Sequence, residues 1–335
     1  MADGGVVVLD GSHIRNALPN LQQRLEGRHL DGQISGSAFL ALAESEASSI
    51  LFDLALPENL KTLVLNRLQL TDNIESLQFD SRTVLPKLQE YLLALADELK
   101  DDPLVVSILD GSVIRLFLED EDDFAMLAEN LFTDLDTDDS GKLSRNELRA
   151  ALVQMGVEMG VPPLSVKPEA DALLTNILKK HGAEGNQELG QAQFAQLLQG
   201  ILQDIADSLA SKPIVIIQEI KIINGSQLRK FLADDKLLQE VTHLFEELDV
   251  NKDGKVSKAE LRPLFESKGS EWGLPPPEAN DTVVLLYDQV FASVDQDHSG
   301  QLERNEFEVL IKGILETFAE QLAANPIFHD LEGAD

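Results

Sequence analysis

The chain contains no cysteine in its 335 residues. This absence excludes disulfide bonds, thiol catalysis and thiolate metal sites, and it suits a reducing compartment. No stretch approaches the roughly 18 to 20 consecutive apolar residues that a membrane-spanning helix needs. The opening Met-Ala-Asp-Gly-Gly lacks the basic start of a signal peptide. Because the second residue is Ala2, we also expect no N-myristoylation.

Basic residues are scarce: 27 Lys and Arg stand against 59 Asp and Glu, giving a net charge of −32. This balance argues against nucleic acid or an anionic membrane as a partner, and it favours cations or basic protein surfaces. Solubility accounts for part of the acidic excess. Apolar residues make up 43% of the chain, and its length suits two or three domains with their own cores.

Two twelve-residue loops, 249–260 (DVNKDGKVSKAE) and 295–306 (DQDHSGQLERNE), carry oxygen-bearing side chains at regular positions. A calcium ion takes six to eight oxygen ligands, which such a loop supplies from positions 1, 3, 5, 7, 9 and 12. Position 6 must turn sharply and is glycine in both loops, at Gly254 and Gly300. The predicted ligands, with backbone carbonyls at Lys255 and Gln301, are Asp249, Asn251, Asp253, Lys255, Ser257, Glu260, Asp295, Asp297, Ser299, Gln301, Glu303 and Glu306.

A third loop, 136–147 (DTDDSGKLSRNE), repeats this pattern. Apolar residues at helical spacing flank the loops, which predicts an amphipathic helix on each side. The pattern resembles the EF-hand family, a helix–loop–helix calcium-binding unit; one isolated loop would also fit an acidic turn between ordinary helices, but tandem loops argue against that. The predicted ligands of the third loop are Asp136, Asp138, Ser140, the carbonyl of Lys142, Ser144 and Glu147.

The chain contains three internal repeats, which begin VVVLDGSHIRNAL, VVSILDGSVIRLFL and IKIINGSQLRKFL. Each repeat ends with a long apolar-striped segment that stops at Pro103, Pro213 or Pro326. We therefore divide the chain into 1–103, 104–213 and 214–335, each an expected pair of EF-hands. The β-branched runs before the Gly-Ser pairs are either short strands or buried connectors. The serines that follow these glycines are predicted helix N-caps: Ser12, Ser112 and Ser226.

Loops 27–38 and 182–193 fit the register but lack the acids at positions 1 and 12. In loop 72–83, whose register is uncertain by one residue, only Asp72 and Phe79 match the pattern, and position 12 is Thr83. We expect these three loops to bind no calcium. The predicted fold is all-α, with three tandem EF-hand pairs, six EF-hands of which three are degenerate, and three bound Ca²⁺ ions. In each pair the apolar residues at position 8, such as Val256 and Leu302, should face each other across a short two-stranded contact.

Six hands in three pairs is similar in outline to the calbindin and calretinin group. The DGS and NGS repeats, the PPPEA linker and the segment DLDTDDSGKLSRNELRAAL more closely resemble plant EF-hand proteins that interact with osmotic-stress-activated, sucrose-non-fermenting-related protein kinases. That resemblance implies a calcium sensor that binds a serine/threonine protein kinase and lowers its activity, located in the cytoplasm and also the nucleus. Residue by residue, only the three intact loops carry over.

We expect a calcium sensor and adaptor that regulates a protein partner, without nucleic-acid or membrane binding. Only four methionines occur, so an adaptable Met-rich groove is absent and the partner range should be narrow. The alternatives are a cytosolic calcium buffer, which the acidity supports, and an enzyme under EF-hand control. We expect no enzymatic activity because nothing outside the repeats remains to hold an active site. The single Trp272 is either a partner anchor or a packing residue.

Overall fold

The computed structural model describes residues 5–25, 33–70, 74, 77–80, 82–164, 167–183, 185, 187–234, 237–277, 281–294 and 301–330. The predicted loop residues Asp295, Asp297, Ser299 and Gly300 lie outside this part. The chain divides into two compact units, Met1–Val8, Phe52–Leu54 and Val106–Gln218 in one, and Leu9–Leu51, Ala55–Val105 and Glu219–Asp335 in the other. The predicted domain 104–213 lies mainly in the first unit, and most of 1–103 and 214–335 lies in the second.

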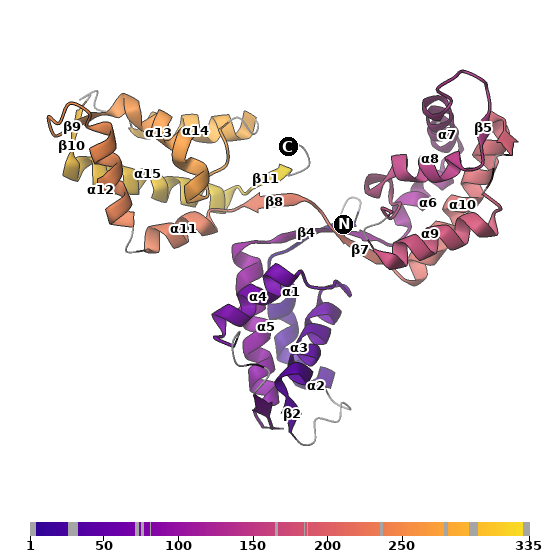
Figure 1. Ribbon diagram of the computed structural model, residues 1–335, viewed down its shortest axis with the longest axis horizontal. Helices are drawn as coiled ribbons and strands as arrows, with labels where there is room; N and C mark the ends of the chain where they lie inside the picture. The colour runs from indigo at the N-terminus through magenta and orange to yellow at the C-terminus, as the bar shows by residue number, and fades with distance from the viewer. Residues whose placement is uncertain are drawn as a thin grey trace. The chain divides into compact units, whose positions relative to one another are not determined.

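Helices dominate each repeat, and short strands begin and end it (Figure 1). The elements of the first repeat are β1 (Val6–Leu9), α1 (Ser12–Ala17), η2 (Leu18–Asn20), α2 (Leu21–Leu25), β2 (Ile34–Ser35), α3 (Gly36–Ile50), α4 (Glu58–Arg67), β3 (Gln78–Phe79) and α5 (Val84–Asp101). Those of the second are β4 (Leu104–Leu109), α6 (Ser112–Glu119), α7 (Glu121–Leu135), β5 (Leu143–Ser144), α8 (Glu147–Met155), η4 (Val157–Met159), α9 (Pro168–Lys180), β6 (Glu188–Leu189), α10 (Gln191–Ser211) and β7 (Ile214–Ile217).

The third repeat follows the same order. Its elements are β8 (Ile220–Ile223), α11 (Ser226–Ala233), α12 (Leu237–Leu248), β9 (Lys255–Ser257), η5 (Lys258–Glu260), α13 (Leu261–Lys268), η6 (Gly269–Trp272), α14 (Asp281–Val294), β10 (Gln301–Glu303), α15 (Arg304–Ala324) and β11 (Ile327–Asp330). The last helix of each repeat ends two residues before its proline, as the sequence predicts. No helix within the described ranges combines the length and apolar character that crossing a membrane requires.

The apolar runs between repeats are strands, which settles a choice that the sequence leaves open. β1, β4 and β7 form one sheet in the order β1-β4-β7, and β8 pairs with β11. Both β4–β7 and β8–β11 are antiparallel, with Ile108 opposite Val215 and Ile222 opposite Phe328. The strand at the end of a repeat therefore pairs with the strand at its start. The predicted all-α fold included strands only between paired loops. The structure therefore differs from that prediction by containing the sheet β1-β4-β7 and the pair β8–β11 as well.

The last helix of a repeat forms the centre of its core. In α10, Phe194, Leu198, Ile201 and Ile205 recur at helical spacing and are all fully buried. The helices that pack against α10 include α6, α7 and α9. In the third repeat, α11, α12 and α14 pack against α15, which Figure 1 shows in yellow-orange. Each core is thus built along one long helix.

Glycine joins the start of each repeat to this central helix. Gly11, Gly111 and Gly225 adopt positive φ values of 82°, 80° and 73°. A Cβ atom placed on them would lie 2.2, 2.3 and 2.8 Å from the carbonyl oxygens of Ala96, Ala206 and Ala319, respectively. Since real Cβ atoms do not approach an oxygen this closely, only glycine permits the contact.

The prediction that the serines cap these helices is wrong. Glycine occupies the N-cap position, and Ser12, Ser112 and Ser226 are the first helical residues. The preceding Asp or Asn side chain instead accepts from the serine N–H, at 2.9 Å for Asp10 and Asp110. The tight approach of the glycine to the long helix places the cap one residue earlier than the serine pattern indicates.

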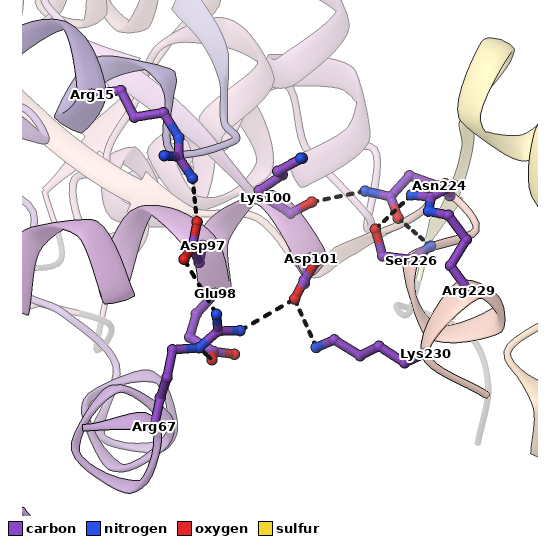
Figure 2. A network of polar contacts seen from close by, with 10 residues as sticks. All are labelled: Arg15, Arg67, Asp97, Glu98, Lys100, Asp101, Asn224, Ser226, Arg229 and Lys230. Carbon is purple, nitrogen blue, oxygen red and sulfur yellow. Dashed lines mark hydrogen bonds and ion pairs between the residues drawn. The ribbon is translucent and has the colours of Figure 1, made fainter. Parts of the chain in front are cut away.

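An arginine four residues after each glycine strengthens this joint. Arg15 contacts Asp97, which follows Ala96 on α5, and Arg115 donates to Asp207 at 2.9 Å. In the third repeat the equivalent Arg229 donates to the Ala319 carbonyl oxygen of α15 at 3.3 Å and to Ser226 Oγ at 3.0 Å. Figure 2 shows the first and third of these arrangements.

Within the second unit, the end of α5 also meets the start of the third repeat (Figure 2). Asp101 accepts from Arg67 of α4 and from Lys230 of α11, the latter at 2.8 Å. Asn224 Nδ2 donates to the carbonyl oxygen of Lys100 at 3.1 Å. These partly exposed ion pairs orient side chains more than they stabilise the fold.

Replacing Gly111 with Ala should destabilise the second repeat by more than about 2 kcal/mol, because a Cβ would collide with Ala206 and φ is positive. Gly141→Ala is the matched control: its φ is also positive, at 69°, but no atom lies within 4 Å of the added Cβ. Thermal denaturation without calcium, followed by circular dichroism, measures both. Equal melting temperatures for the two variants would contradict the close-approach argument.

Candidate metal centre

Two of the three predicted calcium loops are described in full. Loop 136–147 begins directly after α7 and ends at Glu147, the first residue of α8. Loop 249–260 begins directly after α12 and ends at Glu260, the residue before α13. In the third loop, 295–306, only residues from Gln301 onward are described.

Both described loops turn twice through left-handed backbone. The first turn is at position 4, where Asp139 has φ 53° and Lys252 has φ 57°; the second is at position 6, where Gly141 has φ 69° and Gly254 has φ 78°. The glycines at position 6 were expected from the sequence, whereas the strained position 4 was not. These turns wrap the backbone around the side chains at positions 1, 3 and 5.

The acid at position 1 closes the loop. Asp136 accepts from the backbone N–H of Ser140 at 2.9 Å and of Gly141 at 2.7 Å. Asp249 accepts equivalently from Asp253 at 3.0 Å and Gly254 at 2.9 Å. Desolvation opposes ionisation of Asp136, but the hydrogen bonds from Gly141 and Ser140 outweigh it and lower its pKa. The carboxylate is therefore held charged and directed into its loop.

The predicted ligands at positions 1, 3, 5 and 7 lie together in loop 136–147. Ser140 Oγ donates to Asp136 Oδ1 at 3.0 Å and lies 3.1 Å from the Lys142 carbonyl oxygen. Asp138 Oδ1 accepts from the Ser140 N–H at 3.2 Å. All of these donor atoms are oxygens, the ligand type that a hard cation such as calcium prefers.

In loop 249–260, Asn251 and Asp253 make a similar local pair. The Asp253 N–H donates to Asn251 Oδ1 at 3.2 Å, and Asn251 Nδ2 donates to Asp253 Oδ2 at 2.9 Å. An ion needs oxygen rather than an amide nitrogen from Asn251, and its Oδ1 atom supplies that. The residues in both loops thus fit calcium, which would contribute the positive charge that holds the converging carboxylates together.

The long acid at position 12 makes one recurring contact in all three loops. Its carboxylate accepts from the N–H at position 9, at 2.5 Å from Ser144 to Glu147, and at 3.0 Å from Ser257 to Glu260 and from Glu303 to Glu306. Among the described residues no three acidic or histidine side chains gather around one point. The acid at position 12 thus lies against the backbone of its own loop at the start of the next helix.

The paired loops meet at position 8, as predicted. Val256 faces Leu302 where β9 pairs with β10, and Leu143 faces Leu189 where β5 pairs with β6. In the first repeat Ile34 faces Phe79 where β2 pairs with β3. This last pair agrees with numbering the loops from Gly27 and Asp72, although residues 27–32 and 72–73 lie outside the described part.

The structure therefore brings together ligand positions 1 to 7 of loop 136–147 and positions 1 to 5 of loop 249–260. In each loop the carboxylate at position 12 accepts from the backbone N–H at position 9. The assignment of all eighteen ligands stays a prediction.

Replacing Glu147 with Gln should lower the number of bound calcium ions from about three to about two, because a hard cation needs the bidentate carboxylate at position 12. The fold should survive, since Gln193 at position 12 of loop 182–193 makes the same contact, to the Gly190 N–H at 3.3 Å. Isothermal titration calorimetry measures the stoichiometry. Glu129→Gln, an exposed residue on α7, removes the same charge and should leave it unchanged.

A known protein family matches these same segments. The family described as "EF hand" matches residues 127–153, 241–264 and 286–311, each of which contains one of the three predicted calcium loops. An uncharacterised calcium-binding protein of Caenorhabditis elegans is 28% identical over 147 residues. That match covers 41% of this chain and 58% of the relative, so the chain spans a little over half of the relative's length.

The matches and the loop geometry agree on the ion and on the structural unit. The family segments each cover a loop with oxygen donors at the calcium-ligand positions. The relative is named for calcium binding. The three matched segments are therefore EF-hand units, and calcium is the ion that they bind.

Proposed function

We propose that this protein is a calcium sensor and adaptor, built as six EF-hands in three pairs over 1–103, 104–213 and 214–335. Three loops bind calcium, and the other three serve only as structural partners. Binding changes the helix arrangement and thereby regulates a protein partner in the cytoplasm and nucleus. Following the family resemblance of the sequence, that partner is an osmotic-stress-activated serine/threonine protein kinase, which the protein inhibits.

The observation that carries this proposal is the direct link between each acid at position 12 and the apolar core. Glu306 is followed by Phe307, which is fully buried and lies 5.4 Å from the ring of Phe245 on α12. Glu260 is followed by α13, whose Phe265 is also fully buried. Turning either acid from position 9 toward an ion must move the helix that carries these rings.

Phe265 belongs to an aromatic cluster in the third repeat that also includes Phe318 of α15, the helix that carries Phe307. Phe265 contacts Phe291 at 5.5 Å and Phe318 at 5.9 Å, and Tyr287 contacts Phe318 at 5.0 Å between ring centroids. Trp272 packs on Phe265 at 5.2 Å and is 5% exposed, so it is a core residue and not an exposed anchor. A helix movement here would expose apolar surface of the kind that binds a partner helix.

A calcium buffer is the second candidate, and the net charge of −32 favours it. A buffer, however, gains nothing from two loops in the first repeat that lack the calcium-binding acids. The strands β2 and β3 of the first repeat are nevertheless paired, which suits an adaptor.

If the protein is a sensor, calcium should raise the fluorescence of a dye that binds exposed apolar surface. The double variant Glu260→Gln, Glu306→Gln should lose most of this rise, because both acids that move the aromatic cluster are neutralised. A buffer would bind calcium without any rise in the wild-type protein, and that result would remove the sensor proposal.

Trp272 provides an internal probe, because it is the only tryptophan and lies against Phe265. Calcium should shift its emission, since α13 carries Phe265 immediately after loop 249–260. Glu147→Gln, which affects the second repeat, should leave the shift intact. Unchanged emission at saturating calcium would argue against movement of α13.

The choice of partner needs its own test. A purified osmotic-stress-activated, sucrose-non-fermenting-related kinase should lose activity when the protein is added with calcium. An equal concentration of the Glu260→Gln, Glu306→Gln variant should inhibit less. Full kinase activity in the presence of the wild-type protein would remove the kinase from the proposal and leave the sensor intact.

A further inference from the structure

We propose that Arg145 provides the positive charge in the metal-free loop 182–193 that an ion provides in a calcium loop. By binding that loop, Arg145 also positions its own loop, 136–147, for calcium binding. Arg145 occupies position 10 of the calcium loop, so it is not one of the predicted ligands. The inference rests on the proposed calcium site in that loop. It makes Arg145 a positioning residue for calcium binding.

Three hydrogen bonds tie positions 10 and 11 of the calcium loop to the metal-free loop. Arg145 Nη1 donates to the carbonyl oxygen of Gly182 at 2.7 Å, and the Arg145 N–H donates to that of Gln187 at 3.1 Å. Asn146 Oδ1 accepts from the Gly185 N–H at 2.9 Å. These bonds reach positions 1, 4 and 6 of loop 182–193 and add to the strand pair at position 8.

The guanidinium group of Arg145 fits beside loop 182–193 because Gly182 has no side chain. Gly182 stands at position 1, where the calcium loops carry Asp, and its φ of 59° is left-handed. A Cβ on Gly182 would come within 3.2 Å of Arg145 Nη1, so a side chain would crowd the guanidinium. A backbone carbonyl oxygen and a fixed arginine therefore replace the carboxylate and the ion at this end of the loop.

The helices on both sides of loop 182–193 are also joined without metal. His181, at the end of α9, has its Nε2 atom 2.6 Å from Asp204 Oδ2 on α10, and Lys180 Nζ lies 2.7 Å from the same oxygen. At the other end, Gln193 accepts from the Gly190 N–H as the glutamates do in the calcium loops. This hand is thus held in one arrangement by its own side chains.

Arg304, which also stands at position 10 of a predicted calcium loop, 295–306, makes a different contact in the third repeat. Arg304 donates to Glu246 of α12 at 2.9 Å and lies over the Phe245 ring at 5.5 Å. It therefore contacts a helix, whereas Arg145 contacts the partner loop. These different contacts agree with the proposed calcium sites. In the third repeat both paired loops would bind calcium together, whereas in the second repeat one calcium loop pairs with a loop that is already held in place.

The positioning role and simple electrostatics predict opposite effects for the loss of Arg145. Removing a positive charge close to a cation site should tighten calcium binding. Removing an anchor that preorganises the loop should weaken it, by about fivefold to tenfold for one charge-assisted hydrogen bond. The sign of the change therefore separates the two roles.

The test uses the full chain carrying Glu260→Gln and Glu306→Gln, so that loop 136–147 is the remaining predicted site. Calorimetric titration with calcium should show about one ion, and adding Arg145→Ala should weaken binding by about fivefold to tenfold. Arg145→Lys, which keeps a charged donor, should recover most of the affinity. Arg149→Ala is the matched control, because Arg149 lies on α8 of the same hand and donates to Thr175 of α9 at 3.4 Å.

The outcomes separate this inference from the proposed site. If the background chain binds no calcium, the proposed site itself fails. If it binds one ion and Arg145→Ala binds as tightly as Arg149→Ala or more tightly, the positioning role of Arg145 is overturned and the site stands.

Hydrogen exchange of the wild-type protein gives a second readout that needs no variant. A peptide covering residues 182–193 should be equally protected with and without calcium, because Arg145 already holds this loop. Protection that appears only on adding calcium would overturn the inference, even if Arg145→Ala fails to fold.

Discussion

The antiparallel contact between paired loops is the interaction on which the rest of this structure depends. Each contact is only two or three residues long, yet it places the apolar side chains at position 8 face to face in every repeat. Two such residues cannot form a stable sheet alone. They hold because the flanking helices bury them, as Leu143 and Val256 show with exposures of 2% and 1%. Any change in one loop is therefore transmitted directly to its neighbour.

This contact explains why a loop without the acids at positions 1 and 12 still forms its short strand. Loop 182–193 has lost the acids at positions 1 and 12 but retains Leu189, its strand and the contact made by Gln193. A calcium loop without a folded partner would leave its strand edge unpaired and its apolar residue at position 8 exposed. Loop 182–193 thus preserves the contacts that support packing and lacks the acids that the calcium-ligand pattern requires.

A second constraint acts at the end of each repeat that lies away from the paired loops. The close approach of glycine to an alanine carbonyl, supported by an Asp or Asn cap, fixes the first helix on the long last helix. The following strand then pairs with the strand that began the repeat. A movement of a calcium loop, as proposed for the sensor, would therefore act on helices that are anchored at the opposite end, which would favour rotation of an intervening helix such as α13.

Much of this protein follows from local sequence. The positions of the oxygen ligands, the glycines at position 6 and the apolar stripes depend on residues within one loop and its flanking turns. The end of each long helix follows in the same way from the proline two residues later. The pairing of Val256 with Leu302 was predictable because the loops share one register. Such features need no knowledge of distant residues.

Other features were decided only by tertiary structure. Ser112 reads as an N-cap, but the approach of Gly111 to Ala206 on α10 puts the glycine in the cap position and gives the capping bond to Asp110. From the sequence Trp272 is either a partner anchor or a packing residue, with packing favoured, and its contact with Phe265 identifies it as a core residue. The bond from Arg145 to Gly182 joins residues 37 positions apart, and nothing in the ligand pattern predicts it. Spacing along a chain determines which groups a single turn can gather, whereas contacts between elements depend on how those elements pack.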